Sequence, residues 1–95
     1  MSVHQKVTLG DIQADGYVIP LETCNLVFIT KGNSLLACGA VDVGALEKFA
    51  VPAAAISGVS TVDDLLAGVV KAANSFASQR GVHPGDTGAE ALQKL

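Results

Sequence analysis

The sequence is poor in aromatic and basic residues. It has no tryptophan, one tyrosine and three phenylalanines, and its 6 lysine and arginine residues leave a net charge of -3. Nucleic-acid-binding surfaces combine clustered basic residues with aromatic side chains, so this composition argues against a nucleic-acid partner. No apolar run approaches the ~18 residues of a membrane-spanning helix, and residues 1–6 lack the apolar core of a signal peptide. With only two cysteines, these absences predict a protein of the reducing cytoplasm that has no membrane partner.

Charged residues are scarce too, at 16% of the chain against roughly 25% in an average soluble domain. Hydrophobic residues make up 49% of it. Because too few charges remain to cover a small globule, we expect part of the apolar surface to be buried between copies of the chain. The composition therefore predicts a homo-oligomer, which we expect to assemble through the β-rich residues 1–31.

The first half of the chain has the alternation and turn signals of β-strands. Gly10 with Asp11 and Asp15 with Gly16 are typical turn pairs. The segment 31–33, Lys-Gly-Asn, supplies the positive φ that closes a hairpin, and a two-residue turn there places Ile29 opposite Leu36. The predicted strands are residues 3–9, 17–21, 24–30 and 34–41.

The next segment predicts a short helix and one more strand. Asp42 has the side chain of an N-cap for a helix that ends at Phe49, with Leu46, Phe49 and Ala50 facing inward. An apolar strand at 53–57 follows after about a dozen residues. A crossover of that length makes it parallel to the strand at 34–41.

A long amphipathic helix is predicted from Ser60 to Arg80, because its apolar residues recur at helical spacing. Ser60 with Asp63 approximates a capping box, and Gly81 supplies the residue after the helix. Gly68 lies in the middle, where glycine costs about 1 kcal/mol relative to alanine, so we expect a close packing contact there. The polar face of this helix comprises Asp63, Asp64, Lys71, Asn74, Ser75 and Ser78.

A second capping box, Thr87 with Glu90, opens a final helix in which Leu92 and Leu95 face inward. Together these elements predict an α+β fold in a single domain, residues 1–95. An antiparallel β region (1–31) and its hairpin continue into a small mixed sheet (32–95) with helices on one face.

The order of these motifs resembles that of the YunC-like family, bacterial and archaeal proteins of unknown function. The resemblance covers about residues 16–95. It implies a small α+β domain that forms a tetramer through its N-terminal β region, and it implies no established activity. The motifs that carry it are the hairpin, Cys38-Gly39, the short helix, the alanine-rich strand, Ser57-Gly58-Val59, Asp64-Leu65-Leu66 and the terminal Gly85-x-x-Gly88-x-x-Ala91-Leu92-x-x-Leu95.

Cys38 is a weak candidate for a catalytic thiol, because a nucleophilic cysteine needs a nearby base, cation or helix N-terminus. An imidazole from His4 or His83 of another subunit would supply the base. The alternative is a buried small apolar residue, which its apolar strand favours. A disulfide to Cys24 is not expected, because the hairpin places the two residues on opposite faces. His4, His83, Cys24 and Cys38 lack a recognised ligand spacing, so neither a metal nor a cofactor is predicted.

The carboxyl ends of the strands at 34–41 and 53–57 form one rim, where open α/β sheets bind ligands. We expect a small polar or anionic molecule there, contacting the backbone amides from Gly58 to Thr61, with Asp63 and Asp64 limiting the negative charge tolerated. The favoured function is a non-catalytic, oligomeric module for a small ligand or an interaction, and the alternative is a thiol-dependent enzyme using Cys38. The candidate ligand-binding residues are Asp42, Ser57, Gly58, Ser60 and Thr61.

Overall fold

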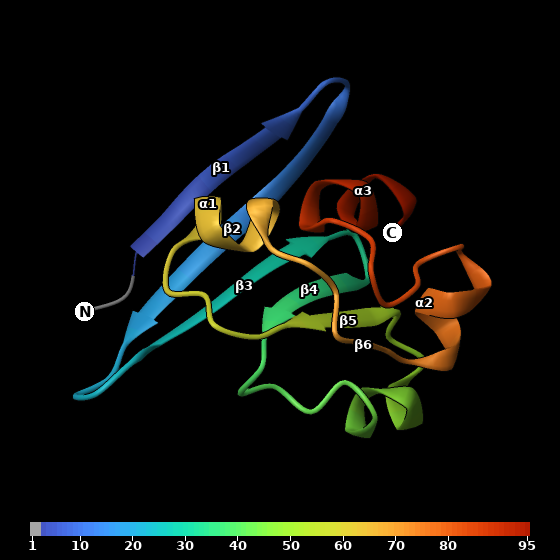
Figure 1. The fold of residues 1–95 in the computed structure, drawn as a ribbon. Helices are drawn as coiled ribbons and strands as arrows, with labels where there is room; N and C mark the ends of the chain where they lie inside the picture. The colour runs from blue at the N-terminus through green and yellow to red at the C-terminus, as the bar shows by residue number, and fades with distance from the viewer. Residues whose placement is uncertain (1–2) are drawn as a thin grey trace.

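The structure is a computed structural model and describes residues 3–95. These residues form a six-stranded sheet with the strand order β1-β2-β3-β4-β5-β6 (Figure 1). The strands are β1 (Val3–Leu9), β2 (Ile12–Pro20), β3 (Asn25–Lys31), β4 (Ser34–Cys38), β5 (Ala53–Ile56) and β6 (Ala72–Ala73). The helices are the 3-10 helix η1 (Ala45–Phe49) and the α-helices α1 (Val62–Ala67), α2 (Ser75–Gln79) and α3 (Gly88–Lys94).

The sheet is mixed, which confirms the predicted α+β fold. Strands β1 to β4 form an antiparallel meander, β5 is parallel to β4, and β6 is antiparallel to β5. The predicted hairpin register is confirmed as well: Ile29 lies opposite Leu36, and Gly32 in the turn has a φ of 58°. The crossover through η1 therefore brings the carboxyl ends of β4 and β5 to one end of the sheet.

One predicted turn is wrong. Gly10 has a φ of 62° and forms the turn between β1 and β2, but Asp15 and Gly16 lie inside β2, paired with Lys6 and Gln5. Gly16 is required by packing rather than by a turn, since a Cβ there would lie 2.9 Å from a methyl of Val62 in α1. A glycine that lets a helix approach a strand has the same local sequence signal as a glycine in a turn.

The predicted long helix is also wrong, because it is broken in two. Helix α1 ends at Ala67, and Gly68 turns the chain into an extended conformation with φ -74° and ψ -179°. The expected close contact of Gly68 is confirmed, since a Cβ there would lie 2.5 Å from a methyl of Ile56. The chain then pairs with β5 as β6 and begins α2 at the N-cap Asn74. Backbone pairing to the sheet edge thus overrides the helical periodicity of residues 60–80.

The cap and the inward side chains predicted for the short helix differ from what is observed. Its N-cap is Gly44, while Asp42 accepts hydrogen bonds from the backbone N–H groups of Gly44 (3.0 Å) and Ala45 (3.3 Å). Phe49 is 73% exposed rather than inward, and Ala50 is exposed too. Only Leu46 packs against the sheet. The final helix matches its prediction, with a complete capping box between Thr87 and Glu90.

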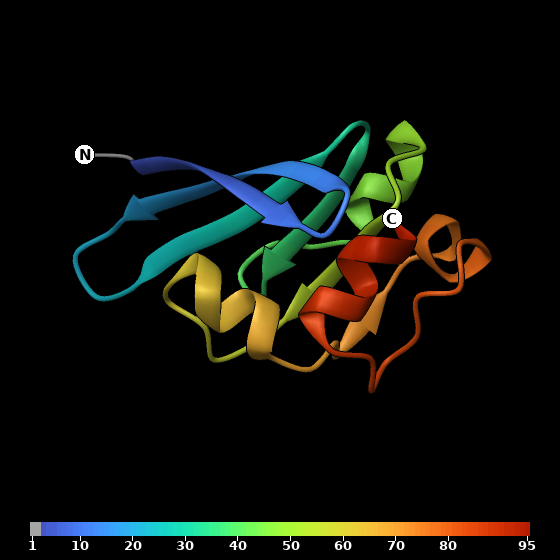
Figure 2. The ribbon, with the colours of Figure 1, turned by 90° about the horizontal axis from the view of Figure 1, so that it is seen from above.

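Helices cover the sheet unevenly (Figure 2). Helices α1 and α3 pack on one face, where the main core includes Ile29, Leu36, Leu65 and Leu92. The η1 segment lies on the opposite face and packs against β5 through a small cluster that includes Val43. On that same face, β1 to β3 carry a ladder of stacked rings from His4, Tyr17 and Phe28. No helix in residues 3–95 is long and apolar enough to span a membrane.

Candidate functional site

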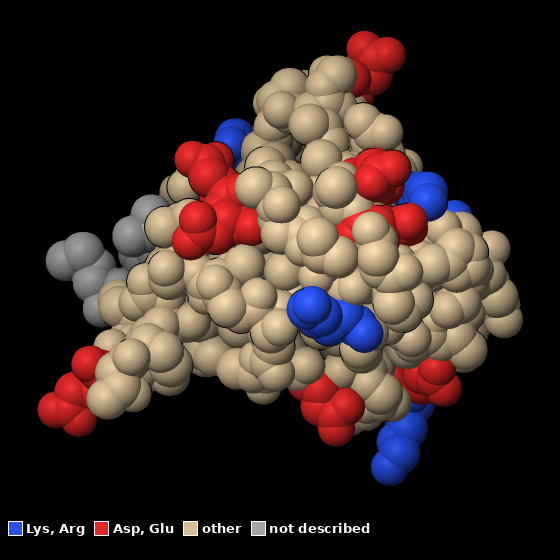
Figure 3. Space-filling model, in the orientation of Figure 1, with Lys and Arg blue, Asp and Glu red and all other residues tan. Residues whose placement is uncertain are grey.

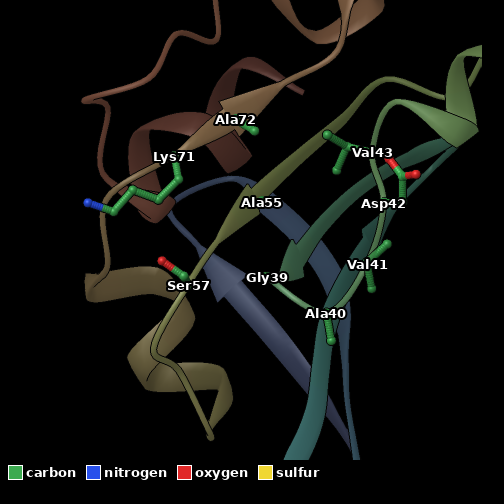
Figure 4. Close-up of a pocket in the computed structure, with 9 residues that line it drawn as sticks. All are labelled: Gly39, Ala40, Val41, Asp42, Val43, Ala55, Ser57, Lys71 and Ala72. Atoms are coloured by element: carbon green, nitrogen blue, oxygen red, sulfur yellow. The ribbon is translucent and has the colours of Figure 1, made fainter.

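A hollow of about 460 Å³ opens beside the carboxyl ends of β4 and β5 (Figure 4). One wall is the loop that follows β4, and the other is formed by the end of β5 and the start of β6. Most of the residues that line it are small and apolar, and ligand pockets typically combine such a lining with a few polar groups that orient the ligand. We call it the first hollow. It is lined by Gly39, Ala40, Val41, Asp42, Val43, Ala55, Ser57, Lys71 and Ala72.

A second hollow of about 380 Å³ adjoins the first. The two share Gly39, Ala40 and Ser57, and they meet where the loops after β4 and β5 touch. Gly39 permits this contact, since a Cβ there would lie 3.2 Å from the Cβ of Ser57. The second hollow is lined by Cys24, Asn25, Cys38, Gly39, Ala40, Ser57, Gly58 and Val59.

The structure brings together three of the five predicted ligand-binding residues. Asp42 and Ser57 line the first hollow, and Gly58 lines the second with Ser57. Ser60 and Thr61 line neither hollow and are engaged in capping α1. The Thr61 hydroxyl accepts a hydrogen bond from the Asp64 N–H (3.0 Å), and the Ser60 N–H donates to the Asp64 carboxylate (3.2 Å).

The Asp64 carboxylate occupies the position that the sequence suggests for an anion. The hydrogen bond that the Ser60 N–H donates to this carboxylate, with smaller contributions from Thr61, holds the pKa of Asp64 below its usual range. The group therefore stays ionised at neutral pH and opposes a second negative charge at the start of α1. The hollows, rather than the helix end, are the places where a ligand can be accommodated.

Cys38 lies at the edge of the main core and is 5% exposed. It lines the second hollow, but among residues 3–95 no imidazole lines either hollow. His4 instead pairs with Asp15 at 2.9 Å. Cys24 is exposed and both thiols are free. The described chain therefore does not assemble a thiol with a base. It also contains no cluster of three or more His, Cys, Asp or Glu residues suited to a metal ion.

Lys71 lines the first hollow, which sequence reasoning missed. The predicted helix places it on a solvent-facing surface, but it precedes β6 and lines the first hollow. Its backbone N–H donates to the carbonyl of Ala55 at 2.9 Å, which ties it to β5. A signal for this was present in the sequence: a glycine at 68 followed by two β-branched residues, 69–70, favours an extended segment over a helix.

Asn74 was also missed, and it holds the first hollow together. It is 5% exposed, although the predicted helix has it on the polar face. Its side-chain oxygen accepts from the N–H groups of Ala53 (3.2 Å) and Ala77 (3.0 Å), and its amide donates to the carbonyls of Val43 (3.1 Å) and Val51 (2.8 Å). One side chain thus joins the start of β5 and the start of α2 to both ends of the segment that carries η1.

A second side-chain hydrogen bond fixes the segment that carries η1. The Glu47 carboxylate, in the middle of η1, accepts a hydrogen bond from the backbone N–H of Ser75. This bond keeps the pKa of Glu47 below its usual range. Because Glu47 and Asn74 hold the η1 segment against α2, the loop that walls the first hollow is anchored on its far side.

We compared the sequence with models of known protein families. The model of the Domain of unknown function (DUF1805) matches residues 37–95. The chain belongs to the DUF1805 family. Every residue that lines the first hollow falls within the matched segment. The expectation of an uncharacterised family is confirmed, since no activity is attached to the DUF1805 description.

No curated protein matches the chain. Among solved structures, the DUF1805 chain is similar to the crystal structure of a protein of unknown function from Thermoplasma acidophilum. The two are 26% identical, and the similarity covers 100% of this chain and 93% of that one with a TM-score of 0.93. The described sheet and helices, β1 and β2 included, therefore have a counterpart in a solved structure.

Proposed function

We propose that this DUF1805 chain is a non-catalytic module that binds a small polar molecule in the first hollow. The observation that carries the proposal is the position of the hollow at the carboxyl ends of adjacent parallel strands, β4 and β5, with Asp42 and Ser57 on its surface. Strands of α/β sheets end in loops at this edge, and ligands commonly bind among those loops. Gly58 extends the site into the second hollow, whereas Ser60 and Thr61 cap α1 and line neither hollow.

Amide chemical-shift mapping tests this proposal. Nitrogen-15-labelled protein is titrated with phosphate, acetate and glycine at millimolar concentrations, and we expect weak binding with the largest shifts at 39–43, 55–58 and 71–72. The variant Ala72→Phe fills the first hollow and should abolish those shifts. Its control is Ala45→Phe, an exposed alanine that lines neither hollow. Shifts confined to other parts of the chain, or no shifts at all, would overturn the proposed site.

A thiol-dependent reaction at Cys38 is the alternative, and it rests on the place of this residue in the second hollow. Its thiol is almost fully buried and lacks an imidazole within the described chain. A base would have to come from another subunit. The binding module needs no such addition, so it has the stronger support.

We also propose that the chain self-associates, most simply as a tetramer, through residues 1–31, of which 1 and 2 lie outside the described part. Support comes from the apolar groups near one end of β2: Ile19 is 37% and Leu21 is 51% exposed. The ring ladder of Tyr17 and Phe28 lies on the same sheet face, uncovered by any described helix. Exposed apolar patches of this kind are typical of interaction surfaces. A cytoplasmic location belongs to the same proposal and agrees with the two free thiols.

A further inference from the structure

The first hollow has opposite charges on opposite walls. Asp42 comes from the loop after β4, and Lys71 comes from the residue before β6. Figure 4 shows the two side chains on different sides of β5, with the Ser57 side chain directed to the same side as Lys71. The face seen in Figure 3 carries both acidic and basic groups among mostly uncharged atoms. The hollow is therefore dipolar rather than simply anionic or cationic.

The two charges are held differently. One carboxylate oxygen of Asp42 accepts from the backbone N–H groups of Gly44 and Ala45, which fixes the acid against its wall. The Lys71 ammonium has neither a hydrogen bond nor an ion pair within residues 3–95, although its backbone is tied to Ala55. The anion is thus fixed, whereas the cation, which Figure 4 shows directed away from Asp42, lies on a flexible, four-carbon stem that can turn toward a ligand.

The surface between the charges is apolar. Val41, Val43, Ala55 and Ala72 line it, and Asn74 holds Val43 in place by a hydrogen bond of 3.1 Å to its carbonyl. An extended polar ligand would lose hydration against these side chains without gaining hydrogen bonds. The middle of a well-matched ligand is therefore apolar, and its two ends are charged.

We propose that the first hollow takes a small molecule with a carboxylate at one end and an ammonium at the other, separated by a short apolar chain. The carboxylate pairs with Lys71 and accepts a hydrogen bond from Ser57, and the ammonium pairs with Asp42. This inference rests on the proposed binding function and specifies its ligand class. It extends the expected polar or anionic ligand by assigning a role to Lys71.

Three probes of equal chain length test the assignment: 6-aminohexanoate carries both charges, hexanoate only the carboxylate and hexylammonium only the ammonium. Each is titrated into labelled protein while the amide shifts of the first hollow are followed. Because exposed ion pairs are weak and charged hydrogen bonds somewhat stronger, 6-aminohexanoate should bind roughly three- to tenfold more tightly than either single-charge probe.

Two charge-neutralising variants test the contacts of the two ends of the ligand separately. Lys71→Gln should remove the advantage of 6-aminohexanoate over hexylammonium, and Asp42→Asn should remove its advantage over hexanoate. Asp42→Asn keeps an oxygen that can accept from Gly44 and Ala45, so the loop is retained. Lys48→Gln is the matched control, since Lys48 is exposed and lines neither hollow.

The outcomes separate the two proposals. If single-charge probes shift the hollow residues as strongly as 6-aminohexanoate, the dipolar assignment is overturned while the binding site stands. If none of these probes, nor phosphate, acetate or glycine, shifts the hollow residues, the binding function itself fails. A loss of the advantage in Lys48→Gln would show a long-range charge effect and would also overturn the assignment.

Discussion

Gly88, the first residue of α3, lies directly against the backbone carbonyl of Leu65 in α1. A Cβ at position 88 would overlap the Leu65 oxygen and lie 2.9 Å from the Leu65 carbonyl carbon. The Gly88 N–H also donates to the carbonyl of Gly68 at 2.9 Å. The end of α1 and the start of α3 are therefore in backbone contact, and no flexible side chain can move aside for a larger residue.

Gly88→Ala should consequently lower the free energy of unfolding by about 1–3 kcal/mol or more, as in overpacked cores. Chemical denaturation measures this. Gly44→Ala is the control, because its Cβ would meet only a side-chain oxygen of Asp42, at 3.2 Å. Its stability should stay within about 0.5 kcal/mol of the parent. Equal stability of Gly88→Ala and the parent would contradict the packing described.

Asn74→Asp removes both donors of the buried amide but keeps an acceptor for Ala77 in α2. It leaves the carbonyls of Val43 and Val51 without their partner, so we expect a loss of about 2–4 kcal/mol in unfolding free energy. Amide hydrogen exchange should accelerate in 43–51 more than in β1 to β3. Asn33→Asp is the control: Asn33 makes one exposed hydrogen bond, to Ala50. Uniformly faster exchange would refute a local role for Asn74.

Stability should fall in acid. The Thr87 N–H lowers the pKa of Glu90, and the His83 N–H and then Lys94 lower that of Asp86. Groups whose folded pKa is depressed stabilise the fold above their unfolded pKa, and this contribution is lost as pH falls through the folded pKa. Thermal unfolding between pH 7 and about pH 3 should show this decline. Glu90→Gln should show a shallower decline, and an unchanged slope would contradict the capping-box contribution.

The two thiols should react at different rates. Cys24 is exposed and Cys38 is buried, so a disulfide-exchange reagent should modify one thiol quickly in native protein and the second only after denaturation. Cys24→Ser should remove the fast phase and leave the slow one. Rapid modification of Cys38 at neutral pH, without denaturant, would instead favour the thiol-enzyme alternative.

Self-association should depend on the open face of the sheet. Ile19→Lys places a charge among its exposed apolar groups and should lower the molar mass found by light scattering during size-exclusion chromatography, as should deletion of residues 1–15. Gln79→Lys in α2 is the control, since Gln79 is polar, exposed and outside residues 1–31. A monomeric parent protein at micromolar concentration would rule out the oligomer.

The features that were predictable from the sequence depend on neighbours in the chain. Residues 31–34 specify the hairpin through their own turn geometry, and the capping box of Thr87 and Glu90 closes within four residues. The parallel pairing of β4 and β5 follows from a short crossover, whose handedness and length leave few alternatives. The rim that carries Asp42 and Ser57 follows in turn from that pairing.

The features that were missed depend on contacts between distant segments. Residues 60–80 have the periodicity of one helix, yet Gly68 packs on Ile56 and the chain joins the edge of the sheet as β6. That break buries Asn74 and carries Lys71 to the first hollow. Hydrophobic periodicity records which residues avoid water, and here it indicated strands of the sheet, while local turn and capping residues specified the hairpin register and the cap of α3. It does not record which backbone groups across the fold will pair, so only the tertiary structure decided where the helix ends and which charged residues line the first hollow.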